Sequence, residues 1–312
     1  MEVQQYTKQL EEQTKEQEVL NQRLFAQSLE VEQKSFEIER YSKEVEILKE
    51  KAEATLKHLN DSINYSKYIQ DSLLPLNSFM EKNIPGDFFI YYQPKETIGG
   101  DFYYVNKVGD YLILAVADCT GHGVPGALIT MLGITFLNDI IDQNIVNNTG
   151  ETLNILRTKI KTTFRSYGDN LQNKNGLDIA LCAINLKTNV MQYSGAFNPL
   201  YIFRDKELIE YKATRNPIGY YPIEKDFKTT KIQLQNNDII YLFSDGYPDQ
   251  VGGPKNRKFS KRQFKDFLQE IHTFPIAKQS IFVDKIMQKW MGNSSQVDDI
   301  TLMGIKWNNF IV

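Results

Sequence analysis

The sequence predicts an α+β protein in which a domain of antiparallel strands and flanking helices follows one long helix. Residues 1–74 contain no Gly and no Pro and are rich in Glu, Gln, Lys and Leu, which favours helix. After Pro75 the chain changes to short β-rich runs separated by turns. Helical stretches lie among these runs at about 125–142, 152–166 and 261–291. This arrangement predicts a β-sandwich flanked by helices, so we expect two domains, 1–74 and 75–312.

The N-terminal segment carries a heptad pattern. With Val3 at position a, eight of the nine a positions are apolar, whereas the d positions include several polar residues such as Gln13, Gln27 and Lys34. This pattern predicts a dimeric coiled coil of low stability, and a solvated single helix or a partly disordered arm is the alternative. Pro75 should end the helix at or just before Leu74. The a positions are Val3, Leu10, Gln17, Leu24, Val31, Ile38, Val45, Ala52 and Leu59.

Composition excludes several classes of protein. The 312 residues carry a net charge of −3, which gives no indication of a nucleic-acid surface. We find no run of about 18 apolar residues and no secretory signal, so we predict no membrane span. Cys119 and Cys182 form no C-x-x-C pair, which fits a reducing compartment. We therefore expect a cytoplasmic protein, or the cytoplasmic end of a longer one.

Turn signals divide the C-terminal part into hairpins. They separate β-rich runs such as "FYYVNKVGDYLILAVAD", "LDIALCAINLKTNVMQYSGA" and "FKTTKIQLQNNDIIYLFSD". We expect each turn to join two neighbouring strands of one sheet. The turns are Gly109-Asp110, Lys187-Thr188-Asn189, Arg204-Asp205 and Asn236-Asn237-Asp238.

Aspartates stand where strands meet turns. Asp101 follows two glycines and opens a strand, while Asp118 and Asp245 each end an apolar strand. Asp298 and Asp299 open the last strand. An Asp beside a Gly is usually only a turn former, but a buried strand that ends in an unpaired carboxylate is costly unless a cation or a donor meets it. Together these residues predict a site for hard cations such as Mg²⁺ or Mn²⁺, which prefer oxygen ligands.

Two such ions bridged by a carboxylate and a water molecule hydrolyse phosphate esters, because the metals acidify the water into a nucleophile. The stretch "TIGGDFYYV" also resembles the signature of a GGDEF nucleotide cyclase. That enzyme needs an acidic residue after the Asp, where this chain has Phe102. A metal-dependent phosphatase therefore explains the stretch better.

Six motifs in order resemble those of SpoIIE-type bacterial serine phosphatases, in the protein phosphatase 2C superfamily. They are "GGDF", "ADCTGHGVPGAL", "SGAFNPLYI", "PIG", "LFSDGYPDQ" and "DDITL", and with the upstream "IQDSLLP" the resemblance covers residues 69–307. It implies an α-β-β-α sandwich with two Mn²⁺ or Mg²⁺ ions. It also implies removal of phosphate from phosphoserine or phosphothreonine of a protein by a metal-bridging water.

The resemblance also implies roles for individual residues. Asp118 would bridge the metals and the Cys119 carbonyl would add a ligand, while Asp245 and Asp298 would hold one ion. Asp101 would bind the other ion, directly or through water. Asp299 would hold the ligands in place without binding a metal itself. The catalytic set is thus Asp101, Asp118 and Asp245. Backbone close to the metals would need Gly99, Gly100, Gly121, Gly123 and Gly246.

Two departures from the superfamily matter. The phosphate-binding Arg of eukaryotic members is missing before Asp101, and only Lys95 lies in that stretch. The general-acid His of those members has no equivalent, because His122 lies four residues after Asp118 instead of two, and we expect His122 to shape the turn.

The family pattern makes the helical arm a regulator. We expect the chain to be a homodimer through the coiled coil, with arm movement setting the elements near Asp101 and Asp118. The implied substrate is a phosphorylated regulatory protein, of the anti-sigma-factor-antagonist type by analogy. The alternative is a catalytically inactive scaffold or signalling protein of the same fold.

Overall fold

The computed structural model describes residues 1–142, 148–164 and 175–309. Helix α1 runs from Glu2 to Leu73, so the predicted long helix is present and ends just before Pro75. All side chains of residues 1–62 are exposed, and ion pairs such as Lys34–Glu30 join successive turns. By its contacts the chain divides into Met1–Ser62 and a compact unit that begins at Ile63. The boundary after Leu74 and the pairing of two arms stay predictions.

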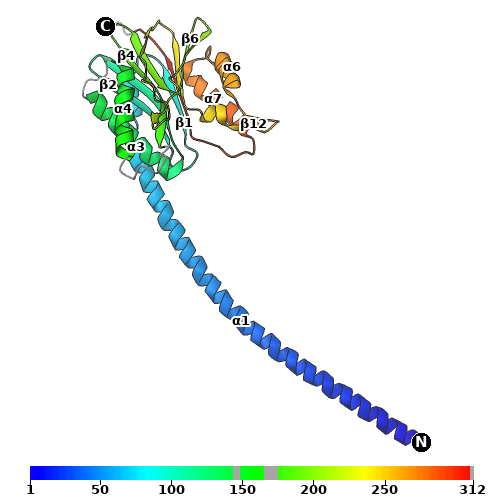
Figure 1. The fold of residues 1–312 in the computed structure, drawn as a ribbon. Coiled ribbons are helices and arrows are strands. Elements are labelled where there is room, and N and C mark those ends of the chain that lie inside the picture. The colour runs from blue at the N-terminus through cyan, green and yellow to red at the C-terminus, as the bar shows by residue number, and fades with distance from the viewer. Residues whose placement is uncertain (143–147, 165–174, 310–312) are drawn as a thin grey trace. The chain divides into compact units, whose positions relative to one another are not determined.

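The compact unit contains two antiparallel sheets (Figure 1). The first sheet has the order β1 (Phe88–Gln93), β13 (Ile300–Lys306), β10 (Ile239–Phe243), β6 (Leu200–Arg204) and β7 (Glu207–Tyr211). The second has the order β2 (Asp101–Val108), β3 (Tyr111–Cys119), β4 (Gly176–Asn185), β5 (Val190–Ala196) and β9 (Thr230–Gln233), with β8 (Ile218–Gly219) beside β4. A short separate ribbon pairs β11 (Val251–Gly252) with β12 (Arg257–Lys258).

Helices cover the outer face of each sheet, which gives the predicted α-β-β-α sandwich (Figure 1). The second sheet is covered by α3 (Gly123–Asp142) and α4 (Thr149–Phe164), and the first by α6 (Lys261–Ile271) and α7 (Ile276–Met291). The shorter helices are α2 (Asn77–Asn83) and α5 (Gly246–Asp249).

The alternation of side chains along a strand explains the layers. In β3, Ile113 and Ala115 face outward into the core beneath α3 and α4. Leu112 and Leu114 face the opposite way, into the core between the sheets, where Leu242 of β10 also lies. Residues spaced by two from these positions therefore share their face, a rule that also places the aspartates.

Three of the four expected hairpins are present: β2–β3, β4–β5 and β6–β7. The expectation for Asn236-Asn237-Asp238 is wrong, because β9 pairs with β5 in one sheet and β10 pairs with β6 and β13 in the other. The segment is a crossover between sheets. The buried Asp238 carboxylate fixes it by accepting hydrogen bonds from the Arg204 guanidinium and the Gln235 amide.

Among the described helices, α3 alone is long and apolar enough to cross a membrane. Half of its most apolar window is buried inside the fold. Its Gly133 lies directly over the Phe102 ring of β2. This packing gives α3 the character of a core helix.

Candidate metal centre

Three aspartates from the second sheet lie side by side. Asp101 pairs with Asp118 across β2 and β3, and Asp118 pairs with Asp178 across β3 and β4. Directly opposed residues of antiparallel strands project from the same face. Asp118 follows Leu114 and Val116 at successive spacings of two along β3, and both of those residues lie in the core between the sheets. The three carboxylates therefore line one end of the gap between the two sheets.

The first sheet brings its aspartates to the same end. Asp245 follows β10 at the start of α5, and Asp298 and Asp299 directly precede β13. The two sheets are joined here by Asp101, whose Oδ2 accepts hydrogen bonds from the hydroxyls of Ser244 (2.6 Å) and Thr301 (2.8 Å). All five predicted aspartates thus lie at one end of the sandwich.

Asp299 holds the loop that leads into β2. Its Oδ1 accepts a hydrogen bond from the Lys95 amide (2.7 Å) and its Oδ2 accepts one from the Gly100 amide (2.6 Å). A Cβ on Gly99 would lie 2.8 Å from Asp299 Oδ1, so the loop fits closely only without a side chain there. Both carboxylate oxygens therefore accept hydrogen bonds from the backbone of the loop.

Gly100 also lets two carbonyls approach the loop. A Cβ on Gly100 would lie 2.4 Å from the Gly121 oxygen and 2.9 Å from the Cys119 oxygen. The Cys119 carbonyl, which we predicted to be a ligand, thus lies against the residue before Asp101, while the Cys119 side chain is buried among apolar residues.

His122 pairs with a glutamate from another loop. Its Nδ1 is 2.6 Å from Glu96 Oε1, and both side chains are about half exposed. A Cβ on Gly123, whose φ is +64°, would meet the Glu96 carboxylate at 2.6 Å. The His122–Glu96 pair joins the turn after β3 to the loop before β2.

Burial and the charges of neighbouring carboxylates raise the pKa values of Asp101, Asp118 and Asp298. Burial, together with the charges of Asp299 and Asp298, raises the pKa of Asp101 to about 8, against the opposing effect of its two hydroxyl donors. Burial and the charges of Asp101, Asp245 and Asp298 hold the pKa of Asp118 well above its ordinary value. The pKa of Asp298 is also raised, by burial and then by Asp245 and Asp299.

Asp178 also belongs to the cluster, although no sequence motif marks it. Burial and the charge of Asp245 raise its pKa to about 7, and Lys261 opposes this shift. The available signal was a single acidic residue within the apolar strand "GLDIALCAIN". Its meaning depends on the register with β3, which the sequence does not state.

The chemistry of the donors fits a hard divalent cation. They are carboxylate and carbonyl oxygens whose repulsion a positive charge would relieve. In the described parts of the chain, however, no three His, Cys, Asp or Glu side chains are already arranged to hold a metal ion. Two of the carboxylates are engaged elsewhere, since Asp101 accepts from hydroxyls and Asp299 from amides.

Comparison with known proteins decides the family. The family model of stage II sporulation protein E (SpoIIE) matches residues 109–308, more than half of the chain. The chain belongs to the SpoIIE family. The resemblance seen in the six sequence motifs is confirmed.

Solved structures have the same fold. The SiaA-PP2C domain of Pseudomonas aeruginosa is 28% identical with a TM-score of 0.74, over 82% of this chain and 99% of that one. The RsbU and RsbW domains of a Mycobacterium tuberculosis protein are 20% identical with a TM-score of 0.58, over 72% and 61%. The phosphatase domain of SpoIIE from Bacillus subtilis, with part of its regulatory domain, is 18% identical with a TM-score of 0.57, over 71% and 63%.

The search of curated proteins found no match.

The family model and the SiaA-PP2C structure together give this SpoIIE-family chain a PP2C phosphatase fold, and its family supports a serine/threonine phosphatase function.

Proposed function

We propose that this SpoIIE-family chain is a protein serine/threonine phosphatase that uses two Mn²⁺ or Mg²⁺ ions. The observation that carries the proposal is that Asp101, Asp118, Asp245 and Asp298 lie at one end of the sandwich, where burial and neighbouring carboxylates raise the pKa values of Asp101, Asp118 and Asp298. A cluster of this kind is costly in a protein that binds no cation.

The ligands follow from the geometry and the family pattern. Asp118, which lies between Asp101 and Asp178 in the sheet, would bridge the ions, and Asp245 and Asp298 would hold one of them. The Cys119 carbonyl and Asp101 would complete the set. When bound, the ions acidify water and neutralise charge on the phosphate oxygens.

Other residues keep these ligands in place. The hydroxyls of Ser244 and Thr301 fix the orientation of Asp101, and Asp299 holds the preceding loop. Lys95 opposes the rise in the pKa of Asp298, so its positive charge lies near the site, where it is available to the substrate phosphate.

Hydrolysis of p-nitrophenyl phosphate with and without Mn²⁺ tests the proposal. We expect metal-dependent turnover in the wild type and a loss of about a thousandfold or more in Asp245→Ala, because the site loses a metal ligand. Asp266→Ala changes the same residue type on an exposed position of α6 and should keep full activity.

An equal loss in both variants, with both folded, would contradict the role of Asp245. Absence of turnover in the wild type at every Mn²⁺ concentration, even on phosphoserine peptides and without residues 1–60, would favour the alternative, an inactive scaffold of the same fold.

Regulation through the arm is also part of the proposal. The last turns of α1 contact the metal-site loop, because the buried Gln70 donates a hydrogen bond from Nε2 to the Gly99 carbonyl (2.6 Å) and accepts one from the Gly99 amide. Asp101 follows two residues later. A shift or rotation of α1 would therefore move a ligand-bearing loop.

We further propose a cytoplasmic homodimer, paired through the heptads of 1–59, that acts on a phosphorylated regulatory protein. The mycobacterial match combines RsbU and RsbW domains, which supports a regulatory setting. Deletion of residues 1–60 tests the role of the arm: an unchanged mass in solution together with unchanged turnover would contradict it.

A further inference from the structure

One surface stretch is strongly basic in a chain of net charge −3. Residues 250–265 contain six Lys and Arg and no Asp or Glu. Five of the six have exposed positions on the β11–β12 ribbon and at the start of α6. We name these five the basic strip: Lys255, Arg257, Lys258, Lys261 and Arg262.

The basic strip adjoins the carboxylate cluster. Lys258 Nζ lies 2.7 Å from Asp249 Oδ2, at the end of the helix that Asp245 begins. The hydrogen bond with Asp249, and then the charges of Asp249 and Asp245, raise the pKa of Lys258, and Lys261 opposes the rise in the pKa of Asp178. Two residues of the strip therefore interact electrostatically with the carboxylate cluster.

Most of this charge is available to a partner. Lys258 pairs with Asp249, but Lys255, Arg257, Lys261 and Arg262 form no ion pair with any described residue. Four like charges within eight residues of the chain repel one another, which favours an acidic ligand near them.

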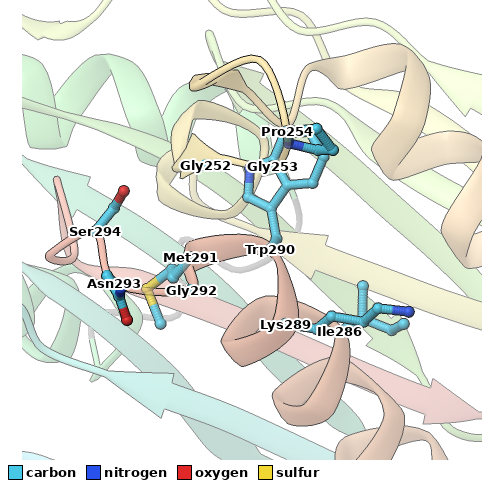
Figure 2. A pocket seen from close by; sticks show the side chains of 10 residues that line it. All are labelled: Gly252, Gly253, Pro254, Ile286, Lys289, Trp290, Met291, Gly292, Asn293 and Ser294. Carbon is cyan, nitrogen blue, oxygen red and sulfur yellow. The ribbon is translucent and has the colours of Figure 1, made fainter.

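An apolar groove of about 630 Å³ adjoins the strip (Figure 2). Pro254, next to Lys255, forms one wall, and Trp290 and Met291 of α7 form another. The indole of Trp290 is fixed because its Nε1 donates a hydrogen bond to the Gln250 carbonyl (3.0 Å). The same Gln250 accepts from the Val297 amide, directly before Asp298. The groove is therefore formed by the segment that follows Asp245 and by the segment that precedes Asp298.

We propose that the basic strip and this groove bind the phosphoprotein substrate through an acidic segment that carries an apolar side chain. The proposal rests on the phosphatase function proposed above. A cluster of aspartates repels an acidic phosphoprotein, and the strip offsets that repulsion and steers the substrate toward the site. The groove takes the apolar side chain, which sets the register of the bound segment.

Phosphoserine peptides test the proposal. Three peptides of equal length carry Asp/Glu flanks with a Leu, Ser/Asn flanks with the same Leu, or Asp/Glu flanks with the Leu replaced by Ser. We expect the first to have about tenfold higher kcat/KM than either of the others at low salt. Its advantage over the peptide with uncharged flanks should disappear at about 0.5 M salt.

Charge reversal locates the effect. Arg257→Glu/Arg262→Glu should abolish the preference for acidic flanks and leave hydrolysis of p-nitrophenyl phosphate unchanged. The control Lys107→Glu/Lys231→Glu makes the same change in net charge at exposed positions on β2 and β9, and should keep the preference. An equal preference in both variants would overturn the proposal.

Binding separates this proposal from the phosphatase itself. If no variant hydrolyses any substrate, fluorescence anisotropy of the labelled acidic peptide still applies: binding lost only in Arg257→Glu/Arg262→Glu supports the docking surface. Tighter binding of single-stranded DNA or of phosphatidylserine vesicles than of the acidic peptide, with no preference among peptides, would overturn it.

Discussion

Gly100 sets the distance between two segments of the site. It lies between the loop held by Asp299 and the turn after β3, and the Gly121 and Cys119 carbonyls approach its Cα. Its φ is not positive, so the backbone conformation itself would accept another residue. Space is the constraint at this position.

We predict that Gly100→Ala destabilises the protein by about 1–3 kcal/mol, because a methyl group 2.4 Å from the Gly121 oxygen forces backbone to move. The same shift should displace the Cys119 carbonyl and reduce metal-dependent turnover. Urea unfolding and p-nitrophenyl phosphate hydrolysis measure the two effects. In the control Gly109→Asn, the turn residue has a φ of +57°, which Asn tolerates, and no atom lies within 4 Å of the new Cβ. A smaller effect at Gly100 than at Gly109 would contradict the steric argument.

Asp178 should make the metal-free protein sensitive to pH. The pKa of its carboxyl group is about 7 in the fold, against an ordinary value of 3.8. The folded chain therefore holds a proton that the unfolded chain releases, and stability present below about pH 4 is lost as the pH rises through about 7.

We predict that Asp178→Asn, in EDTA, is more stable than the wild type at pH 8 by up to about 4 kcal/mol, the value of three pKa units. The difference should shrink toward pH 5. Urea unfolding of both proteins at pH 5, 6.5 and 8 measures it. Parallel stability curves over this range would show that Asp178 titrates normally in the fold.

The residues of the site divide into those that the sequence reveals and those that it does not. Asp101, Asp118 and Asp245 stand at ends of apolar runs, and an end of a strand is visible in the sequence. Asp178 stands inside a run, and only the register of β4 against β3 brings it beside Asp118. Gln70 is likewise one of many polar residues in α1, and nothing in the sequence pattern marks it as the residue that is buried.

At the scale of elements, the contact between α1 and the loop before β2 depends on one side chain. Gln70 satisfies both the amide and the carbonyl of Gly99, and it is 2% exposed. Loss of a partner from a buried backbone group costs about 1–3 kcal/mol. That cost falls on a loop that carries a proposed ligand.

We predict that Gln70→Leu raises the Mn²⁺ concentration needed for half-maximal activity by about tenfold, because the loop before Asp101 loses two hydrogen bonds. Turnover at saturating Mn²⁺ should change much less. The control is Tyr68→Leu, two residues away at an exposed position of the same helix. An unchanged Mn²⁺ dependence in Gln70→Leu, with the protein folded, would separate α1 from metal binding.

Turn residues predict where a strand ends, but not which sheet the next strand joins. The turn residues at 236–238 correctly mark the end of one strand and the start of the next. They do not state that the chain changes sheets there, because that choice depends on which edge can accept each strand. β9 adds to the edge beside β5, while β10 lies inside the other sheet.

For the whole molecule, the order of six motifs was enough to predict the sandwich, since each motif sits at a strand end and the family places them together. The basic strip and the groove were not predicted. Their residues are spread over 252–294, and only the packing of α7 against the β11–β12 ribbon joins them.

Assembly is also a property of the whole molecule. In the single chain the apolar side chains of the arm are exposed, at a positions such as Val31 and Ile38 and at other positions such as Leu29 and Phe36. The heptad assigns only the first pair to the seam between two helices, and places the second pair at position f, on the opposite face.

We predict that Val31→Glu/Ile38→Glu converts a dimer into a monomer, because two buried charges would face each other across the seam. Leu29→Glu/Phe36→Glu makes the same substitutions outside the seam and should leave the dimer intact. Light scattering coupled to size-exclusion chromatography measures the mass. A monomeric wild type would favour the solvated single helix instead.

The hydrogen bonds around Asp101 have a consequence for synthesis of the chain. Asp101 and Gly100 are held by Ser244, Asp299 and Thr301, which lie between 143 and 200 residues further along. A chain still on the ribosome cannot complete this cluster until β13 has emerged, whereas the arm is made first. If the arms pair as proposed, two nascent chains can therefore pair before the proposed phosphatase site forms, and a product truncated before Asp299 would keep the arm while lacking the site.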